Sequence, residues 1–182
     1  MPRPHFTLTV ATSLDGLIAR APDDAPHLWA SAEEQALFFA DVAAADWGVM
    51  GRNTHTVADR PDRRRIVFSS RGGGWMRPTQ LWLDPAGLTP GDLARRVAGV
   101  RALGNGLILG GTAVHDWFLD HRAIDRVHLT VEPVRFGTGL PLFSRHPGPA
   151  EDVLASLGFR RTASRVLNAA GTRHSIWEPQ AG

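Results

Sequence analysis

The chain has 182 residues, 43% of them hydrophobic, and a formal net charge of +2 at pH 7. These values are typical of a globular protein and the length suits one domain, so we expect a single domain over residues 1–182. The sequence holds no Lys, Tyr or Cys. This excludes thiolate nucleophiles, Lys Schiff bases, Walker-type phosphate loops and dehydrogenases that use a Tyr/Lys proton relay.

The 20 residues counted as Lys or Arg are therefore all Arg, and they are scattered except at residues 63–65, 95–96 and 160–161. Scattered arginines do not form the basic patch of a nucleic-acid-binding protein, so we expect no nucleic-acid partner. No apolar run approaches the roughly 18 residues of a membrane span, and no signal peptide precedes the first strand-like segment. We therefore expect a cytoplasmic protein without a membrane partner.

Local patterns predict strands and helices that alternate along most of the chain. Strands are expected at residues 5–11, 47–50, 65–68, 80–83, 107–109 and 126–133. Helices are expected from Ser31 onward and at residues 53–58, 92–103 and 112–120. Residues 159–167 and 174–177 form an expected hairpin around Gly171. This order predicts an α/β sandwich with a mixed central sheet, flanking helices and a C-terminal β-hairpin.

Three predicted strand ends present free backbone N–H groups beside small or cationic residues. Helix N-termini attract phosphate, glycine lets backbone approach a pyrophosphate closely, and a guanidinium can grip phosphate oxygens. Taken singly, each is also typical of an ordinary turn or solvated loop. The three groups are Gly51, Arg52, Asn53 and Thr54; Ser69, Ser70 and Arg71; and Leu109, Gly110, Gly111, Thr112 and Ala113.

The ordered set of motifs is more specific than any one of them. It comprises residues 11–19 (ATSLDGLIA), 49–54 (VMGRNT), 66–70 (IVFSS) and 108–114 (ILGGTAV). Together they resemble dihydrofolate reductase and the C-terminal reductase domain of the riboflavin-biosynthesis deaminase-reductase. The resemblance covers nearly the whole chain, and the SLDG form at residues 13–16 favours the riboflavin branch.

The resemblance implies a dihydrofolate-reductase-like three-layer sandwich with NADPH as its cofactor. The residues of the three strand ends would contact the phosphates of NADPH, with Ser69 and Ser70 near the 2′-phosphate. Ala11 and Ile18 would flank the nicotinamide. The chemistry implied is hydride transfer to a C=N or C=O group of a small-molecule substrate, either a ribosylaminopyrimidine or a folate.

The catalytic acid is ambiguous in the sequence. Dihydrofolate reductases carry a carboxylate on the first helix, and Trp29 followed by Glu34 resembles that arrangement. Counting back from Gly51, however, places the expected acid nearer Gln35. Glu34 is also the fourth residue of a Ser-x-x-Glu capping box that begins at Ser31, so a catalytic role and a cap both stay open.

Several further expectations are less specific. Asp15 either contacts substrate or caps its own loop. The phosphoribosyl-binding pattern of the riboflavin branch is not recognisable after the second helix, where residues 56–64 form a compact charged run. A non-catalytic nucleotide-binding module is therefore an alternative function. Relatives of the riboflavin branch imply a homodimer. We expect no metal site, because the acidic and His residues of 115–121 lack a third ligand from another element.

Overall fold

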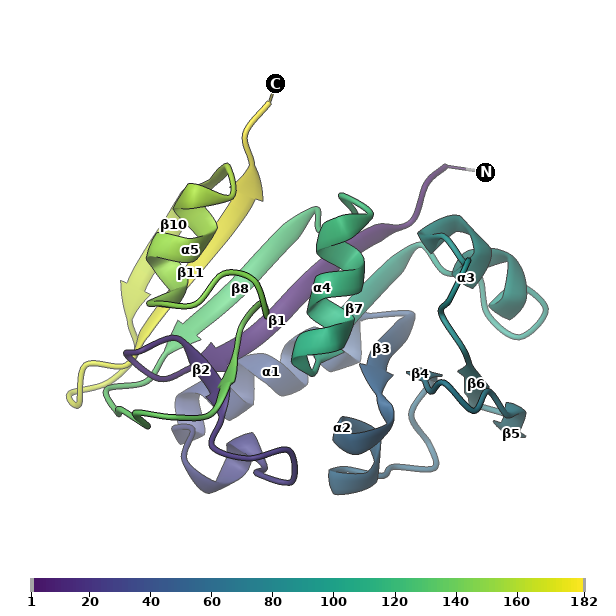
Figure 1. Cartoon of the computed structure of the whole chain (residues 1–182), viewed down its shortest axis with the longest axis horizontal. Coiled ribbons are helices and arrows are strands. Elements are labelled where there is room, and N and C mark those ends of the chain that lie inside the picture. Colours follow the sequence, from purple (N-terminus) through teal and green to yellow (C-terminus); the bar gives the residue numbers. More distant parts are fainter. Residues whose placement is uncertain (1, 182) are drawn as a thin grey trace.

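The computed structural model describes residues 2–181 and is built around one nine-stranded sheet (Figure 1). The strand order across the sheet is β10-β11-β8-β1-β7-β3-β4-β6-β5. The strands are β1 (His5–Thr12), β3 (Trp47–Gly51), β4 (Arg65–Phe68), β5 (Gly74–Arg77), β6 (Gln80–Leu83), β7 (Asn105–Gly110), β8 (Arg126–Val131), β10 (Phe159–Val166) and β11 (Arg173–Pro179). A separate two-stranded sheet pairs β2 (Leu17–Ala19) with β9 (Leu140–Pro141).

The sheet is mixed, as the sequence predicts. The strands from β8 through β1, β7, β3 and β4 to β6 pair in parallel, whereas β5, β10 and β11 pair antiparallel. Parallel strands end at the same edge, so the carboxyl ends of β1, β3, β4 and β7 lie together there. In open α/β sheets this edge is where ligands bind. The antiparallel hairpin of β10 and β11 also confirms the predicted C-terminal element.

Helices cover both faces of the sheet, and Figure 1 shows α4 and α5 in front of it and α1 behind. The helices are α1 (Ala32–Ala44), α2 (Arg52–Val57), α3 (Pro90–Val97), α4 (Thr112–Asp120) and α5 (Ala150–Ser156), with a short 3-10 helix at Pro26–Leu28. This arrangement confirms the predicted three-layer α/β sandwich.

Alternating residues of β1 show the division between the faces. Phe6 and Leu8 are fully buried in the main apolar core, where the ring of Phe6 lies 4.8 Å from that of Phe118 in α4. Thr9 points to the opposite face and donates to Asp41 of α1 at 2.9 Å. The α4 face is therefore a closed hydrophobic core, and the α1 face carries polar groups.

The structure differs from the sequence predictions at one helix end and in three elements that were not predicted. The third helix ends at Val97, well before residue 103, because the chain turns at residues 98–101. The sequence patterns predict no element at β5, at the β2–β9 pair or at α5. β5 is largely exposed and begins at Gly74, so it lacks the alternation of a half-buried strand.

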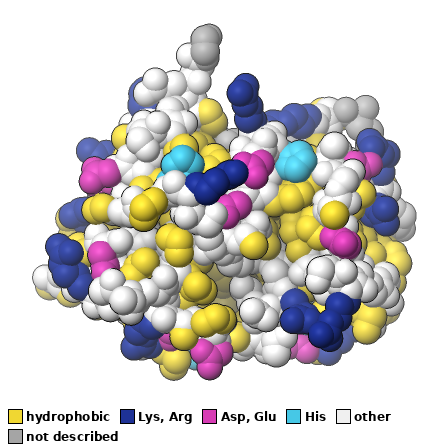
Figure 2. Space-filling model, in the orientation of Figure 1, with side chains coloured by type: hydrophobic (Ala, Val, Ile, Leu, Met, Phe, Trp, Pro, Cys, Tyr) yellow, Lys and Arg dark blue, Asp and Glu magenta, His cyan; other side chains and the backbone are white. Residues whose placement is uncertain are grey.

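On the face seen in Figure 2, arginines are interspersed with acidic side chains. Several arginines of the chain form ion pairs, among them Arg126 with Glu178 at 2.7 Å and Arg3 with Asp125 at 2.6 Å. Within residues 2–181, no helix combines the length and the apolar character needed to cross a membrane.

Candidate active site

A cavity of about 640 Å³ lies on the α1 face of the sheet. Its floor is formed by alternate residues of three adjacent parallel strands, and α1 and α2 supply its walls. The floor residues are Thr9 and Ala11 from β1, Gly48 and Met50 from β3, and Leu107 and Leu109 from β7. Ile18 also lines the cavity, so the two residues expected to flank a nicotinamide, Ala11 and Ile18, lie in one pocket.

The two glycine turns predicted from the sequence meet at one end of this cavity. β3 and β7 pair in parallel with Met50 opposite Gly110, which brings the N-termini of α2 and α4 side by side. A Cβ built on Gly51 would lie 3.9 Å from the Gly111 nitrogen, and one on Gly111 would lie 3.9 Å from the Thr54 Oγ1. Long-range strand pairing therefore unites motifs about 60 residues apart.

Both turns have the chemistry of an anion cradle. Gly51 and Gly111 are the N-caps of α2 and α4, and neither helix has a side-chain cap for its first amides. Those amides carry partial positive charge and stay available for phosphate oxygens. The Thr112 hydroxyl donates to the Pro141 carbonyl at 2.6 Å, so only its backbone N–H is free for such a contact. Ala113, the next residue of this turn, is exposed.

The third predicted strand end, at β4, lies beside the first. Gly51 pairs with Phe68, so Arg52 and Ser69 both follow adjacent strand ends. Ser69 is buried and its Oγ accepts from the Arg71 backbone N–H at 3.3 Å. The side chains at the rim are exposed: Arg52, Asn53, Ser70 and Arg71.

Glu34 is the buried acid of the cavity. It lies on the first turn of α1, is only 7% exposed and lines the pocket. Burial, and then the negative charges of Glu132 and Asp41, raise its pKa to about 7. A carboxyl group with this pKa is protonated about half the time at neutral pH and can give up a proton there. Gln35 also lines the cavity, but its amide donates to the Ala30 carbonyl at 3.3 Å.

The predicted capping box at Ser31 forms only in part. The Ser31 hydroxyl accepts from the Glu34 backbone N–H at 3.3 Å. The reciprocal bond is missing, because the Ser31 N–H donates to Glu132 at 2.7 Å instead. The Glu34 side chain is thus not engaged as a cap, which supports the catalytic alternative.

Asp15 lies away from this acid and binds backbone. Its carboxylate accepts from the N–H groups of Phe136 at 3.2 Å and Gly137 at 2.7 Å. Partial burial raises its pKa, but hydrogen bonds from Ser13, Gly137 and Phe136 outweigh this and lower the pKa to about 2. The geometry matches the loop-capping alternative for Asp15, since the carboxylate is committed to residues 136–137.

The segment after α2 forms an arginine-rich wall of the cavity. Arg60, Arg63 and Arg65 line the pocket, and none of them forms an ion pair within residues 2–181. Arg65 is 7% exposed, and its Nη1 contacts the His55 Nδ1 at 3.2 Å. Cationic groups without carboxylate partners beside a cavity suit an anionic part of a ligand.

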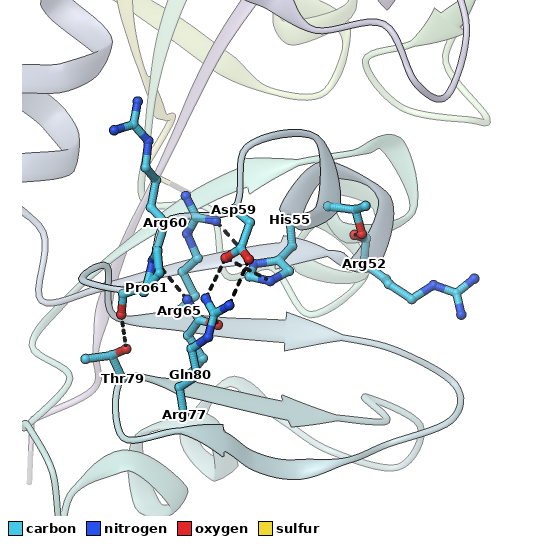
Figure 3. Close-up of polar contacts among 10 residues, drawn as sticks. Arg52, His55, Asp59, Arg60, Pro61, Arg65, Arg77, Thr79 and Gln80 are labelled. Carbon is cyan, nitrogen blue, oxygen red and sulfur yellow. Dashed lines mark hydrogen bonds and ion pairs between the residues drawn. The ribbon is translucent and has the colours of Figure 1, made fainter.

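Figure 3 shows how this wall is held in place. Asp59 accepts from Arg77 at 2.7 and 2.9 Å, and Gln80 donates to the Arg60 carbonyl at 2.9 Å. These bonds tie the segment to β5 and β6. The side chains of Arg52 and Arg60 point away from the cluster (Figure 3).

Sequence reasoning missed two buried polar residues of this region. His115, considered only as a metal ligand, lines the cavity below the second glycine turn, and its Nδ1 contacts the Leu142 carbonyl at 2.9 Å. Burial lowers its pKa to about 4, so it is neutral at pH 7. Glu132 is the second. The sequence around Glu132, just after β8, contains no recognisable motif. Only the fold places Glu132 beside the start of α1.

The chain shares its fold with solved structures that include a dihydrofolate reductase, which confirms the dihydrofolate-reductase-like fold expected from the motifs. No family model matches the chain, and no curated protein does. Solved structures are similar at low sequence identity. One is a protein from Shewanella sp. PV-4 that is named as a riboflavin biosynthesis protein. It has a TM-score of 0.72 and 23% sequence identity, and the match covers 97% of this chain and 99% of that one.

Two further structures belong to reductases. The diaminohydroxyphosphoribosylaminopyrimidine deaminase/5-amino-6-(5-phosphoribosylamino)uracil reductase of Thermotoga maritima has a TM-score of 0.70 and 18% identity, over 98% of this chain and 57% of that one. The dihydrofolate reductase of Enterococcus faecalis, in complex with NADP(H) and RAB-propyl, has a TM-score of 0.67 and 16% identity, over 98% of both chains. At these identities the similarity establishes the fold, and function has to be argued from the site.

Proposed function

We propose that the chain is an NADPH-dependent reductase that delivers a hydride to a phosphorylated ribosylaminopyrimidine, in the manner of a 5-amino-6-(5-phosphoribosylamino)uracil reductase. The observation that carries the proposal is that the acid Glu34 lines the same cavity as Gly111 and Thr54 of the phosphate cradle. A bound nucleotide and a proton source therefore share one pocket. Two of the proteins with similar structures are reductases, which agrees with this chemistry.

The residues present fit NADPH. Gly51 and Gly111 leave room at two adjacent helix N-termini, whose first amides lack side-chain caps. Arg52 makes no side-chain hydrogen bond to another residue in the range 2–181 and supplies a charge at the rim, beside Ser70 and Arg71. NADPH supplies the hydride when bound. The protein binds its phosphates, orients its ring along the strand floor and keeps water out with the apolar side chains of the cavity.

Glu34 is the proton source in this proposal. Reduction of a C=O or C=N group leaves an oxygen or nitrogen that must gain a proton. Glu34 carries one in a buried position about half the time at neutral pH, because its pKa is about 7. In this proposal Asp15 holds the loop at residues 136–137 and takes no part in proton transfer.

The arginine wall supports a phosphorylated substrate. Arg60, Arg63 and Arg65 lie on the cavity and form no ion pair with a carboxylate of residues 2–181, so a phosphate would supply a negative charge beside them. The experiment compares KM for 5-amino-6-(5-phosphoribosylamino)uracil with KM for its dephosphorylated form, in the wild type and in Arg63→Gln. We expect Arg63→Gln to raise KM at least tenfold for the phosphorylated substrate only. Arg96→Gln, at an exposed position on the opposite face, is the matched control.

Dihydrofolate reduction is the second candidate, because a pterin ring also requires a buried carboxyl of the kind that Glu34 provides. The same assay separates the two functions. Turnover of dihydrofolate, with none of the ribosylaminopyrimidine, would replace the first proposal with the second. NADPH binding without turnover of either would indicate a nucleotide-binding module. The homodimer stays a prediction.

A further inference from the structure

A buried carboxylate links three distant segments near the acid of the cavity. Glu132 follows β8 and is 3% exposed. Its Oε1 accepts from both the backbone N–H and the hydroxyl of Ser31, each at 2.7 Å, and its Oε2 accepts from the Thr172 hydroxyl at 2.7 Å. Its backbone N–H donates to the Thr12 carbonyl at 2.8 Å. Glu132 thus connects the start of α1, the end of β1 and the C-terminal hairpin.

The role of Glu132 is clearest by comparison with another helix of the chain. In α3, Asp92 completes a capping box with Thr89: its carboxylate accepts from the Thr89 N–H at 2.8 Å. In α1 the sequence Ser-x-x-Glu predicts the same reciprocal bond from Ser31 to Glu34. Glu132, 101 residues from Ser31, takes that N–H instead. The Glu34 carboxyl is therefore released from the helix end and lines the cavity.

We propose that Glu132 is a positioning residue for Glu34, because it occupies the capping donor of Ser31 and so keeps the Glu34 carboxyl in the cavity. The effect of Glu132 on catalysis rests on the proposed reductase function. The effect of Glu132 on the position of Glu34 can be tested without that function.

Electrostatics adds to the geometry. Within residues 2–181, the charged groups that act on Glu34 are Asp41 on its own helix and Glu132 from the end of β8, and both raise its pKa beyond the effect of burial. Glu132 therefore places Glu34 and also helps it keep a proton. A Glu34 carboxyl returned to the cap would accept backbone N–H groups at a helix N-terminus, which stabilise the charged form and lower the pKa.

The first test measures ionisation of Glu34 directly. The chain has only five Glu residues, at 33, 34, 132, 151 and 178, so selective carbon-13 labelling of their side-chain carboxyls gives a resolvable NMR titration. We expect Glu34 to titrate at about 7 in the wild type. In Glu132→Ala it should titrate at or below its ordinary value of 4.5. In Glu132→Gln, whose amide oxygen still accepts from Ser31, the value should lie between these two.

The matched control is Thr172→Val, which removes the hydrogen bond to Oε2 but leaves the contacts of Oε1 with Ser31 intact. Its Glu34 should titrate as in the wild type. The proposal is overturned if Glu34 still titrates at about 7 in Glu132→Ala. If Glu132→Ala does not fold, Glu132→Leu, which fills the space but offers Ser31 no acceptor, takes its place, and the same value overturns the proposal.

The second test is a double-mutant cycle on turnover with Glu132→Ala and Glu34→Gln. If Glu132 acts through Glu34, turnover of Glu132→Ala falls toward that of Glu34→Gln, and the double variant is no slower than Glu34→Gln alone. Independent, multiplied losses overturn the positioning role. If no reductase activity exists, the proposed function fails, whereas the NMR titration still decides the position of Glu34.

Discussion

The buried acid makes the stability of the protein depend on pH in a way that one substitution should abolish. The pKa of Glu34 is about 7 in the folded protein and 4.5 as an ordinary glutamate. Between these values the folded state binds more protons than the unfolded state, so the free energy of unfolding falls as pH rises through this window. A difference of one pKa unit corresponds to about 1.36 kcal/mol, so the free energy of unfolding is lower by about 3 kcal/mol once the pH exceeds 7.

Glu34→Gln removes the ionisation and should remove this loss. Chemical denaturation of the wild type and the variant from pH 4 to pH 8 measures it. The variant should gain stability relative to the wild type as pH rises, by about 3 kcal/mol in total, because its amide cannot ionise. Glu33→Gln, at the exposed neighbouring position, is the control and should show no such gain. A stability difference between Glu34→Gln and wild type that is constant over this range would refute the reasoning.

Further substitutions test the site residue by residue. Glu34→Gln should lower turnover about 100-fold or more with NADPH binding unchanged, as titration of nucleotide fluorescence would show. Arg52→Ala should weaken NADPH binding by about 1.5–3 kcal/mol and leave NADH binding unaffected; equal losses would assign Arg52 to the fold or the pyrophosphate. Gly111→Val should abolish NADPH binding, because its side chain takes the space of the pyrophosphate, but keep a cooperative thermal transition, since φ is −80° and the new Cβ approaches only the Thr54 Oγ1, at 3.9 Å. Asp15→Asn should lower the melting temperature at pH 7 and much less near pH 2, where the wild-type carboxylate also loses its charge.

Local signals in the sequence predicted much of the fold. The strand Arg65–Phe68 and the helix Thr112–Asp120 were predicted with their observed bounds, because short apolar runs and a helix after paired glycines are visible locally. The β2–β9 pair was not predictable. It joins segments of three and two residues that lie more than 120 residues apart. Strand order likewise depends on long-range pairing that no local pattern carries.

The candidate site shows the same division. The glycine turns have local motifs, and the structure brings them together. Glu34 was ambiguous because the local Ser-x-x-Glu pattern predicts a cap, and the carboxylate that replaces it there comes from Glu132, far along the chain. The arginines of residues 60–65 were indistinguishable from a solvated charge run until the fold placed them on the cavity.

The central claim is that nucleotide binding and substrate reduction take place in the cavity between α1 and α2. The most direct measurement is loss of the reduced-nicotinamide absorbance of NADPH on addition of 5-amino-6-(5-phosphoribosylamino)uracil. We expect a substrate-dependent loss with the wild type, a much slower one with Glu34→Gln, and none with Gly111→Val. A folded wild-type protein that neither binds NADPH nor oxidises it with this substrate or dihydrofolate would contradict the account.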